Sequence, residues 1–491
     1  MLDFGTGADF NLTANVLVFG SDFNGTSGTL IGTFSSISAG LAAAATGDTV
    51  YVRSSGSPYN ENVTLKNGVS LIGQSESGVV INGTMITPAS FDHAVVSNMT
   101  VNNVGDTMLL DMRGTSEITD ATFSHVTFNQ TSDFTGETLI GNGQLANSIA
   151  LHDGNSDGNG LTFQNVTMAS HNFDSSTATA FAYTTFHSGD VDPTQMLLDH
   201  VTLSGTASGT AGSGLGAQWN MTPVSSSEHA YLTLSNSSTS AGGNYYVSGF
   251  DGVDVTGNTF DAQGIALNGV KHGTVTGNTF ENITDAIWAN EVAFNALTNQ
   301  HRGLVIEDAW GTSGVSGVTV HDNTFDTITA ADGAIAFQRF NSGLSGVASI
   351  DRLNDIQVYT NTFTGVADPI YLNPTYFGTD AVLPDSITTQ QLLIGTTGVD
   401  TLSATDVGTT IVGGPGADTI TGGAGDDTVI WHPGDGADAI NGGLQTTADT
   451  LAIYDTSDAD SIQVVTDGTT ITGIGGSTNN VTGIETVTLD A

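Results

Sequence analysis

The hexapeptide Val255-Thr256-Gly257-Asn258-Thr259-Phe260 is followed twenty residues later by a close copy, Val275-Thr276-Gly277-Asn278-Thr279-Phe280. Each copy joins a turn-forming Gly-Asn pair to a short segment of β-branched and aromatic residues, which favour strands. Weaker copies of this turn-and-strand unit occur at 98–101, 125–128, 165–168, 200–203, 320–325 and 358–363. Repetition with a period in this range is typical of a solenoid.

A solenoid explains the residue types of the repeat. Each coil would contribute short parallel strands whose inward Val, Ile, Phe and Leu stack on those of the next coil. Asn tolerates the left-handed backbone of a tight corner, and its amide can bond the Asn above and below. We therefore predict an all-β solenoid over residues 47–364. His125 and His200 occupy the same repeat position as Asn98 and Asn165, so we expect them at the same corner.

The residues before the repeats predict a cap. Short strands are expected early in residues 1–46, followed by a helix over 34–45 with apolar residues three and four apart. The segments that come next, 47–52, 59–65 and 68–73, resemble the start of the right-handed parallel β-helix of the pectate-lyase-like superfamily. That resemblance implies a right-handed coil whose first turn is covered by the N-terminal helix.

Composition excludes several classes of protein. The chain has 491 residues, no cysteine, and 7 Lys+Arg against 50 Asp+Glu, for a formal net charge of −43. Nucleic acids and anionic membranes both require Lys and Arg, so neither is an expected partner. No apolar run is long enough to span a bilayer, and the lack of cysteine excludes disulfide scaffolds and zinc–thiolate sites. Divalent cations are the expected partner, since so acidic a chain repels itself unless its carboxylates are neutralised.

A different repeat follows a proline-containing segment, 365–391, that we interpret as a linker. Residues 413–421 read Gly-Gly-Pro-Gly-Ala-Asp-Thr-Ile-Thr, and 422–430 read Gly-Gly-Ala-Gly-Asp-Asp-Thr-Val-Ile. Both resemble the nonapeptide G-G-x-G-x-D-x-U-x of RTX proteins. Partial copies on either side predict a short calcium β-roll over 392–455, followed by a C-terminal cap and secretion signal over 456–491.

The nonapeptide spacing suits calcium. Six residues form a glycine-rich turn whose carbonyls face an ion, the Asp adds a carboxylate, and three residues form a strand with one inward apolar side chain. Two stacked turns can supply the six to eight oxygens that Ca²⁺ prefers. A flexible linker would not keep apolar residues nine positions apart at Leu402, Ile411, Ile420 and Val429. We predict one to three Ca²⁺ ions. The expected ligand positions are Asp418 and Asp427 with Gly414, Gly416, Gly423 and Gly425, and then Asp400, Asp426, Asp435, Asp438 and Asp449.

The RTX resemblance also implies export. Such proteins usually leave Gram-negative cells by type I secretion, directed by an uncleaved C-terminal signal. The first five residues, Met-Leu-Asp-Phe-Gly, have an acid where an N-terminal signal peptide has bases. Calcium is scarce in the cytosol, so the repeats would fold outside the cell. We therefore expect an extracellular or cell-surface protein exported without an N-terminal signal peptide.

A catalytic function is the main alternative. The order β-helix then RTX repeats resembles that of mannuronan C5-epimerases, and the pectate-lyase-like fold also implies polysaccharide lyases. Such chemistry on uronates requires bases clustered on one face. The candidates are Lys271-His272 and His301-Arg302, together with Arg339. Each pair also has a plainer interpretation, as a coil corner and as a loop between coils respectively. The Asp-Pro-His motif of the epimerases is absent, because Asp192-Pro193 is followed by Thr194.

Two hypotheses and a weaker third therefore remain. We favour a secreted, calcium-binding structural protein that self-associates into an extracellular layer, sheet, filament or matrix. The first alternative is a polysaccharide lyase or C5-epimerase, and the second is an adhesin that binds a cell-surface polysaccharide. Convergence of the five candidate bases in one groove would favour the enzyme.

Overall fold

The computed structural model of the chain describes residues 14–105, 108–112, 115, 117–131, 149–152, 157–174, 180–188, 194–208, 215–223, 230–239, 245–248, 250–261, 264–283, 303–308, 315–328, 334–339, 353–366, 369–372, 386–387, 389, 391–405, 407–432, 435–454, 463–465, 470–472 and 478–490. It divides into two compact units. Unit 1 comprises 1–263 and 286–299, and unit 2 comprises 264–285 and 300–491.

Unit 1 is a parallel β-solenoid with two sheets. The strands of its first sheet are β1 (Val16–Phe19), β2 (Leu30–Phe34), β3 (Thr49–Val52), β5 (Ser70–Gly73), β6 (Val80–Asn82), β8 (Ser90–Asp92), β9 (Val95–Asn102), β11 (Glu117–Thr119), β12 (Thr122–Asn129), β14 (Asp157–Asp174), β16 (Thr194–Ser208), β18 (Ala230–Ser235), β19 (Ser238–Thr239), β21 (Gly252–Thr256) and β22 (Thr259–Asp261). Those of the second are β4 (Val63–Thr64), β7 (Met85–Ile86), β10 (Leu110–Asp111), β13 (Ile149–His152), β15 (Ala180–Ser188), β17 (Leu215–Pro223) and β20 (Tyr245–Ser248). Successive coils pair in parallel, as in β9–β12–β14–β16.

The N-terminal helix is present but shorter than predicted. Within the described residues it is the one helix, α1 (Ile37–Ala43), where the sequence predicted 34–45. Phe34 instead ends β2 and pairs with Val16 of β1. Ser36 forms the N-cap, its side chain accepting the N–H of Ala39, and the helix ends at Ala44, which is extended.

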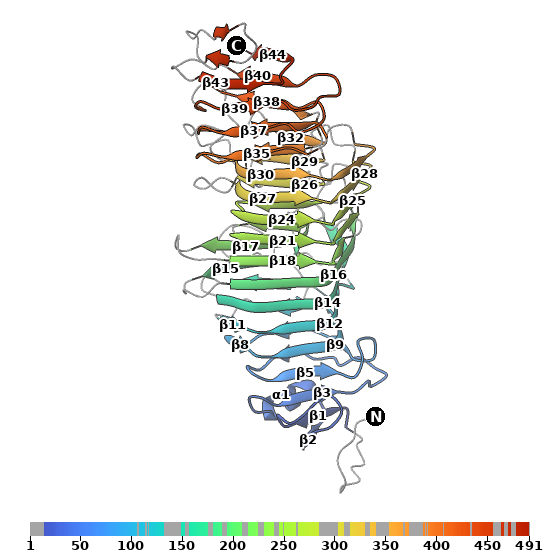
Figure 1. The fold of residues 1–491 in the computed structure, drawn as a ribbon. Helices are drawn as coiled ribbons and strands as arrows, with labels where there is room; N and C mark the ends of the chain where they lie inside the picture. The colour runs from blue at the N-terminus through green and yellow to red at the C-terminus, as the bar shows by residue number, and fades with distance from the viewer. Residues whose placement is uncertain are drawn as a thin grey trace. The chain divides into compact units, whose positions relative to one another are not determined.

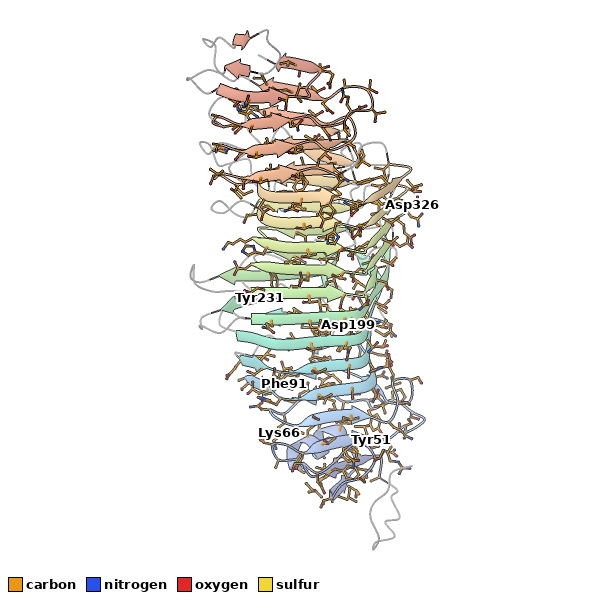
Figure 2. All side chains as sticks on the ribbon, in the orientation of Figure 1. Tyr51, Lys66, Phe91, Asp199, Tyr231 and Asp326 are labelled. Atoms are coloured by element: carbon orange, nitrogen blue, oxygen red, sulfur yellow. The ribbon has the colours of Figure 1, made fainter. Side chains whose placement is uncertain are left out.

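Two charged side chains from the first coils fix the helix against the solenoid. The carboxylate of Glu61 accepts the N–H groups of Ile37 and Ser38, at 2.9 and 3.0 Å. At the other end, Nζ of Lys66 donates to the carbonyl of Ala44 (Figure 2). An acid at the N-terminus and a base at the C-terminus both stabilise a helix through its dipole.

Corner residues of unit 1 confirm the predicted repeat. Asn98, His125, Asn165 and His200 all have positive φ, between 53° and 58°. Strand register places each directly above the one before. Inside the coil, Phe123 stacks on Phe163 with ring centroids 5.2 Å apart. The histidines are therefore members of the corner column, as expected.

Unit 2 begins with further coils of the same kind. The strands of one sheet are β24 (His272–Thr276), β25 (Thr279–Glu281), β27 (Val315–His321), β28 (Thr324–Asp326), β30 (Leu353–Tyr359) and β31 (Thr362–Thr364). The opposite strands are β23 (Ile265–Asn268), β26 (Leu304–Asp308), β29 (Ile335–Arg339), β32 (Ile370–Leu372) and β33 (Ser386–Ile387). Buried phenylalanines stack in register, with 4.7 Å between the ring centroids of Phe280 and Phe325.

The late copies correct one detail of the predicted corner. Positive φ falls on Gly277, Asp322 and Thr360, one residue before the asparagine that was expected to adopt it. The asparagines are buried instead and bond to one another: Nδ2 of Asn278 donates to Oδ1 of Asn323, and Nδ2 of Asn323 to Oδ1 of Asn361, both at 2.9 Å. The corner and the amide ladder thus use adjacent positions, because a side chain at the left-handed corner points to solvent.

The remainder of unit 2 is a β-roll. One sheet contains β34 (Gln391–Ile394), β36 (Thr409–Val412), β38 (Thr428–Trp431), β40 (Thr450–Tyr454) and β44 (Thr486–Asp490), paired in parallel. The other contains β35 (Thr401–Ser403), β37 (Thr419–Thr421), β39 (Ala439–Asn441) and β43 (Thr478–Thr482), with β42 (Thr470–Thr472) and β41 (Gln463–Val465) added antiparallel (Figure 1). Ile411, Ile420 and Val429 lie in its buried core, as predicted.

Chain direction reverses where the roll begins. Strand β34 pairs antiparallel with β30, the last long strand of the coils. The reversal falls within the predicted linker, 365–391, most of which lies outside the described residues. Residues 478–490, predicted as part of a cap, add one more stacked pair of strands to the roll. The predicted domain boundaries themselves stay predictions.

Candidate calcium sites in the C-terminal repeats

The turns of the roll form two columns. The first turn column contains the turns before β35, β37 and β39, with described residues 395–400, 413–418, 432 and 435–438. The second turn column contains those before β36, β38, β40 and β44, with described residues 404–405, 407–408, 422–427, 442–449 and 483–485. Each turn stacks on the next because the strands on either side are in parallel register.

Aspartates form a hydrogen-bonded ladder along the first turn column. The backbone N–H of Asp400 donates to Oδ1 of Asp418, and that of Asp418 to Oδ1 of Asp438, both at 2.9 Å. The ladder ends when the N–H of Asp438 donates to Oδ1 of Asn479 at 2.8 Å. A backbone N–H of one turn thereby fixes one carboxylate oxygen of the aspartate in the next turn along the chain, as seen for Asp418 and Asp438.

The second turn column repeats this arrangement. The N–H of Thr409 donates to Oδ1 of Asp427 at 2.7 Å, and that of Asp427 to Oδ1 of Asp449 at 2.9 Å. At the last turn the N–H of Asp449 donates to Oε2 of Glu485, also at 2.9 Å. Both columns therefore hold their acidic side chains by the same backbone contact.

Three carboxylates in these ladders each have an oxygen without a hydrogen bond. Within the described residues, Oδ2 of Asp418, Asp427 and Asp449 is buried and accepts no bond. The three residues are 1%, 1% and 0% exposed. A buried carboxylate oxygen without a partner costs several kcal/mol, so each of these atoms indicates a ligand that completes the site.

Glycines leave the space around these oxygens. A methyl group added at Gly422 would lie 2.6 Å from Oδ2 of Asp427 and 2.1 Å from the carbonyl oxygen of Gly442. One added at Gly442 would lie 2.6 Å from Oδ2 of Asp449 and 2.1 Å from the carbonyl oxygen of Gly483. A carboxylate oxygen and a carbonyl oxygen of the next turn thus converge on the space that a side chain at each of these positions would fill, and only glycine leaves this space empty.

The predicted glycines contribute to the same turn stacking. Gly414, Gly423 and Gly425 have positive φ, at 81°, 92° and 130°. A side chain at Gly416 would lie 2.2 Å from the carbonyl oxygen of Gly398, one turn away. These residues allow a tight turn and a close approach of backbone carbonyls, which no residue with a side chain would permit.

This donor set fits calcium. Carboxylate and backbone carbonyl oxygens are the hard ligands that Ca²⁺ takes, and the orphaned oxygens of Asp418, Asp427 and Asp449 mark three places for them. Among the described residues, no group of three or more His, Asp or Glu side chains comes together as a metal site. At each place an ion would be held by one or two carboxylates together with backbone carbonyls of two turns.

Burial shifts the acidity of these carboxyl groups. Desolvation raises the pKa of both Asp427 and Asp438 to about 6, and nearby carboxylates add to the shift. Desolvation also raises the pKa of Asp418 and Asp449. A bound cation would reverse this effect, because it stabilises the ionised form.

The other predicted ligands make different contacts, although Asp400 and Asp438 belong to the first ladder. Oδ2 of Asp400 already accepts the N–H and the hydroxyl of Thr396, at 2.7 and 2.9 Å. Asp435 bonds His432, accepting its N–H at 2.7 Å. Asp426 is exposed, and backbone N–H groups, chiefly that of Thr447, lower its pKa. Asp426 and Asp435 lie outside both ladders, and the role of all seven predicted aspartates as calcium ligands stays a prediction.

Sequence reasoning missed two members of the ladders, Asn479 and Glu485. Their signal is an oxygen-bearing side chain two residues before an apolar residue that pairs in register with the inward residues of earlier coils. Asn479 precedes Val481 and Glu485 precedes Val487 as Asp427 precedes Val429. Neither follows the full Gly-Gly-x-Gly pattern, so the nonapeptide template does not find them.

The roll also has a family match. Residues 403–430 match the family model described as RTX calcium-binding nonapeptide repeat (4 copies). These repeats bind calcium. No similar sequence was found among curated proteins. The matched residues carry Asp418 and Asp427 and lie inside the predicted roll. The resemblance of residues 47–364 to the pectate-lyase-like superfamily has no family match and stays a prediction.

The predicted catalytic candidates are only partly described. Lys271 and His272 lie at the start of β24, where the hydroxyl of Ser316 donates to the carbonyl of Lys271 at 3.2 Å. His272 is exposed, and this position is a coil corner. Arg339 ends β29, but its side chain lies outside the described residues, as do His301 and Arg302 altogether. The structure thus does not test their convergence, and the enzyme and adhesin alternatives stay predictions.

One further acidic side chain on the coils is fully engaged. Asp199, on β16, accepts bonds from Asn236, Ser235 and Gln164 and pairs with Nδ1 of His200 at 2.9 Å (Figure 2). Partial burial opposes ionisation, but these bonds together hold the pKa of Asp199 well below its usual value. A carboxylate so stabilised is a poor general base.

Across the described part of the chain, no helix is both long and apolar enough to cross a membrane.

Proposed function

We propose that this chain is a secreted structural protein of an extracellular or cell-surface assembly. In this proposal calcium completes the C-terminal roll and then promotes self-association. The observation that carries it is the set of three buried, unpartnered carboxylate oxygens at Asp418, Asp427 and Asp449.

Coupling of calcium to folding follows from those oxygens. Without an ion, the folded roll has to bury negative charge that the unfolded chain exposes to water. With calcium, the binding free energy adds to the stability of the roll. Because calcium is abundant only outside the cell, such a roll would stay unfolded before export and fold afterwards. The RTX match supports this sequence of events, since such repeats are typical of type I secreted proteins.

Self-association is supported by the outer surface of the same turns. Val399, Val407 and Leu444 lie on the turns of the two columns and are 77%, 48% and 76% exposed. The net charge of −43 opposes contact between copies as long as the carboxylates are bare. Calcium would remove this repulsion locally and leave the apolar turn tips available for contact.

Light scattering and negative-stain microscopy of the full chain test the proposal. We expect monomers in EGTA and growth into ordered particles when calcium is added, but not when magnesium or sodium is added at equal ionic strength. The double variant Val399→Ser/Leu444→Ser should bind calcium normally and assemble less. A monodisperse monomer at saturating calcium would contradict the assembly role and leave only calcium-dependent folding.

A further inference from the structure

We propose that the last coil of the roll holds a calcium ion between Asp449 and Glu485, beyond the residues that match the RTX repeat. This inference rests on calcium binding by the roll. It completes the place marked by Asp449 with residues from 478–490, whose sequence lacks the nonapeptide pattern. Three observations support it: the position of Glu485, the convergence of oxygens on Gly442, and the unpartnered oxygen of Asp449.

Glu485 occupies the ladder position that Asp427 and Asp449 occupy in earlier turns. Thr450 pairs with Thr486, so the residue before each strand, Asp449 and Glu485, falls in register. Oε2 of Glu485 accepts the N–H of Asp449 at 2.9 Å, the same bond that Asp449 makes to Asp427. The N–H of Glu485 donates back to the carbonyl of Asp449 at 3.1 Å.

A longer side chain is consistent with the shorter turn. The turn before β40 spans 442–449, whereas the turn before β44 spans only 483–485. Gly483, at φ 63°, begins this turn. The extra methylene of Glu485 lets a carboxylate reach the same bond from a backbone that takes a tighter path. Glu485 therefore makes the ladder bond that an aspartate makes in the earlier turns.

Carbonyl and carboxylate oxygens converge between these two turns. The carbonyl oxygen of Gly483 lies 2.1 Å, and Oδ2 of Asp449 lies 2.6 Å, from the point where a methyl group on Gly442 would be. Asp449 is 0% exposed and its Oδ2 accepts no hydrogen bond within the described residues. A buried carboxylate oxygen without a hydrogen bond thus lies beside a carbonyl oxygen, which indicates a cation.

Calcium is the cation that this site would take. Glu485 is exposed, so an ion has access from solvent and can keep water among its ligands. Mg²⁺ requires near-ideal octahedral geometry, whereas Ca²⁺ accepts the irregular set of carbonyls that a turn provides. The first turn column offers a contrast, because it ends in Asn479, which makes the ladder bond without a charge.

Calcium stoichiometry of the full chain tests the proposal. Glu485→Gln keeps an oxygen for the N–H of Asp449 but removes the charge, and we expect it to bind one ion fewer than the wild type. The control Glu117→Gln makes the same chemical change at an exposed strand residue of unit 1 and should bind the wild-type number. An unchanged stoichiometry and affinity in Glu485→Gln would overturn the proposal.

Hydrogen exchange gives a second readout that needs no variant. In the wild type, calcium should slow exchange of the amides in 478–490 at least tenfold, and Glu485→Gln should abolish that protection while 419–431 stays protected. Exchange in 478–490 that ignores calcium would overturn the site, even if the roll binds calcium elsewhere. A chain that binds no calcium at all would instead overturn calcium binding by the roll, and this site with it.

Discussion

The backbone N–H of Asp427 donates to Oδ1 of Asp449, 22 residues further along the chain, at 2.9 Å. This bond orients the Asp449 carboxylate so that its other oxygen lies buried between two turns. A ladder bond of this kind and a cation site are therefore parts of one arrangement: the backbone holds one oxygen, and the second is left for an ion.

Removing one orphaned oxygen should remove calcium without breaking the ladder. Asp427→Asn keeps Oδ1 as acceptor for Thr409 but replaces Oδ2 by an amide nitrogen. We expect at least one ion fewer. At calcium a hundredfold above the dissociation constant, we also expect a loss of about 3 kcal/mol of calcium-dependent stability. Isothermal titration and thermal unfolding with and without calcium measure both.

Asp426→Asn is the matched control. It changes the same charge at the neighbouring residue, which is exposed and lies outside the ladders. Its oxygen accepts N–H groups of 446–448, and an asparagine can still accept them. The calcium stoichiometry should stay that of the wild type. Equal losses in the two variants would show that total charge, rather than the ladder position, governs binding.

Without calcium the roll should be more stable in mild acid than at neutral pH. Burial raises the pKa of Asp427 and Asp438 to about 6, above the value near 3.8 of the unfolded chain. Their contribution to stability is thus complete below pH 3.8 and is lost as the pH rises through 6. In EGTA, hydrogen exchange of β38 should accelerate between pH 5 and 7 beyond its intrinsic pH dependence.

Saturating calcium should reverse this trend, because the ion binds only the ionised carboxylates. The calcium affinity of the roll should then fall as the pH drops through 6, and binding near pH 6 should release protons. Affinity that does not change between pH 5 and 7.5 would contradict the raised pKa values.

Close packing of the turns predicts a strong effect of a single methyl group. Gly414 has φ 81°, and a Cβ there would lie 2.7 Å from the carbonyl oxygen of Thr396. Gly56 has φ 68° and nothing within 4 Å. Gly56→Ala should cost about 1–2 kcal/mol from the left-handed backbone alone. Gly414→Ala should cost about 1–3 kcal/mol more from the clash, and weaken calcium binding. Urea unfolding compares the two; equal costs would show that the turns can move apart.

The buried amide ladder should matter independently of calcium. Nδ2 of Asn323 donates to Asn361 and to the carbonyl of Val275, and its Oδ1 accepts from Asn278. Asn323→Leu removes these side-chain bonds from buried groups, and we expect a loss of about 3–5 kcal/mol. Thr324→Ala, on the neighbouring half-exposed residue, should cost under about 1 kcal/mol.

Denaturant unfolding in EGTA and in calcium measures this pair of variants. The Asn323→Leu effect should be the same in both conditions, since the ladder lies in the coils and not in the roll. A larger effect in calcium than in EGTA would mean that the coils and the roll unfold as one cooperative unit.

The sequence predicted the architecture best where the same residue type recurs at the same structural position of each coil. Alternating apolar residues and corner residues such as Asn98 and His125 identified the coils, because a solenoid repeats the same constraint in each turn. The nonapeptide repeat singled out Asp418 and Asp427 for the same reason, and both belong to the aspartate ladders. The helix was predicted too long because Phe34, although correctly spaced for a helix, is part of the pairing of β2 with β1.

Asn323 was misassigned and Glu485 was missed because the role of each depends on the register of paired strands. Asn323 was assigned to the corner itself, but the corner is Asp322, and only three-dimensional stacking distinguishes the residue that turns from the one that bonds its neighbours. Glu485 escaped because its turn is short and lacks the glycine pair. Parallel pairing of β44 with β40 identifies it, and that pairing depends on contacts distant in sequence.

The stacked asparagines of unit 2 have a consequence for how such a chain changes in evolution. Asn278 donates to Asn323 and Asn323 donates to Asn361 through the same Nδ2–Oδ1 bond, so successive coils are joined in the same way. Recombination between two such coils would add or delete a block, such as the 45 residues that separate Asn278 from Asn323, and leave an intact ladder. Gene rearrangements could thus alter this protein's length by whole coils, whereas a point mutation in the ladder would break its bonds.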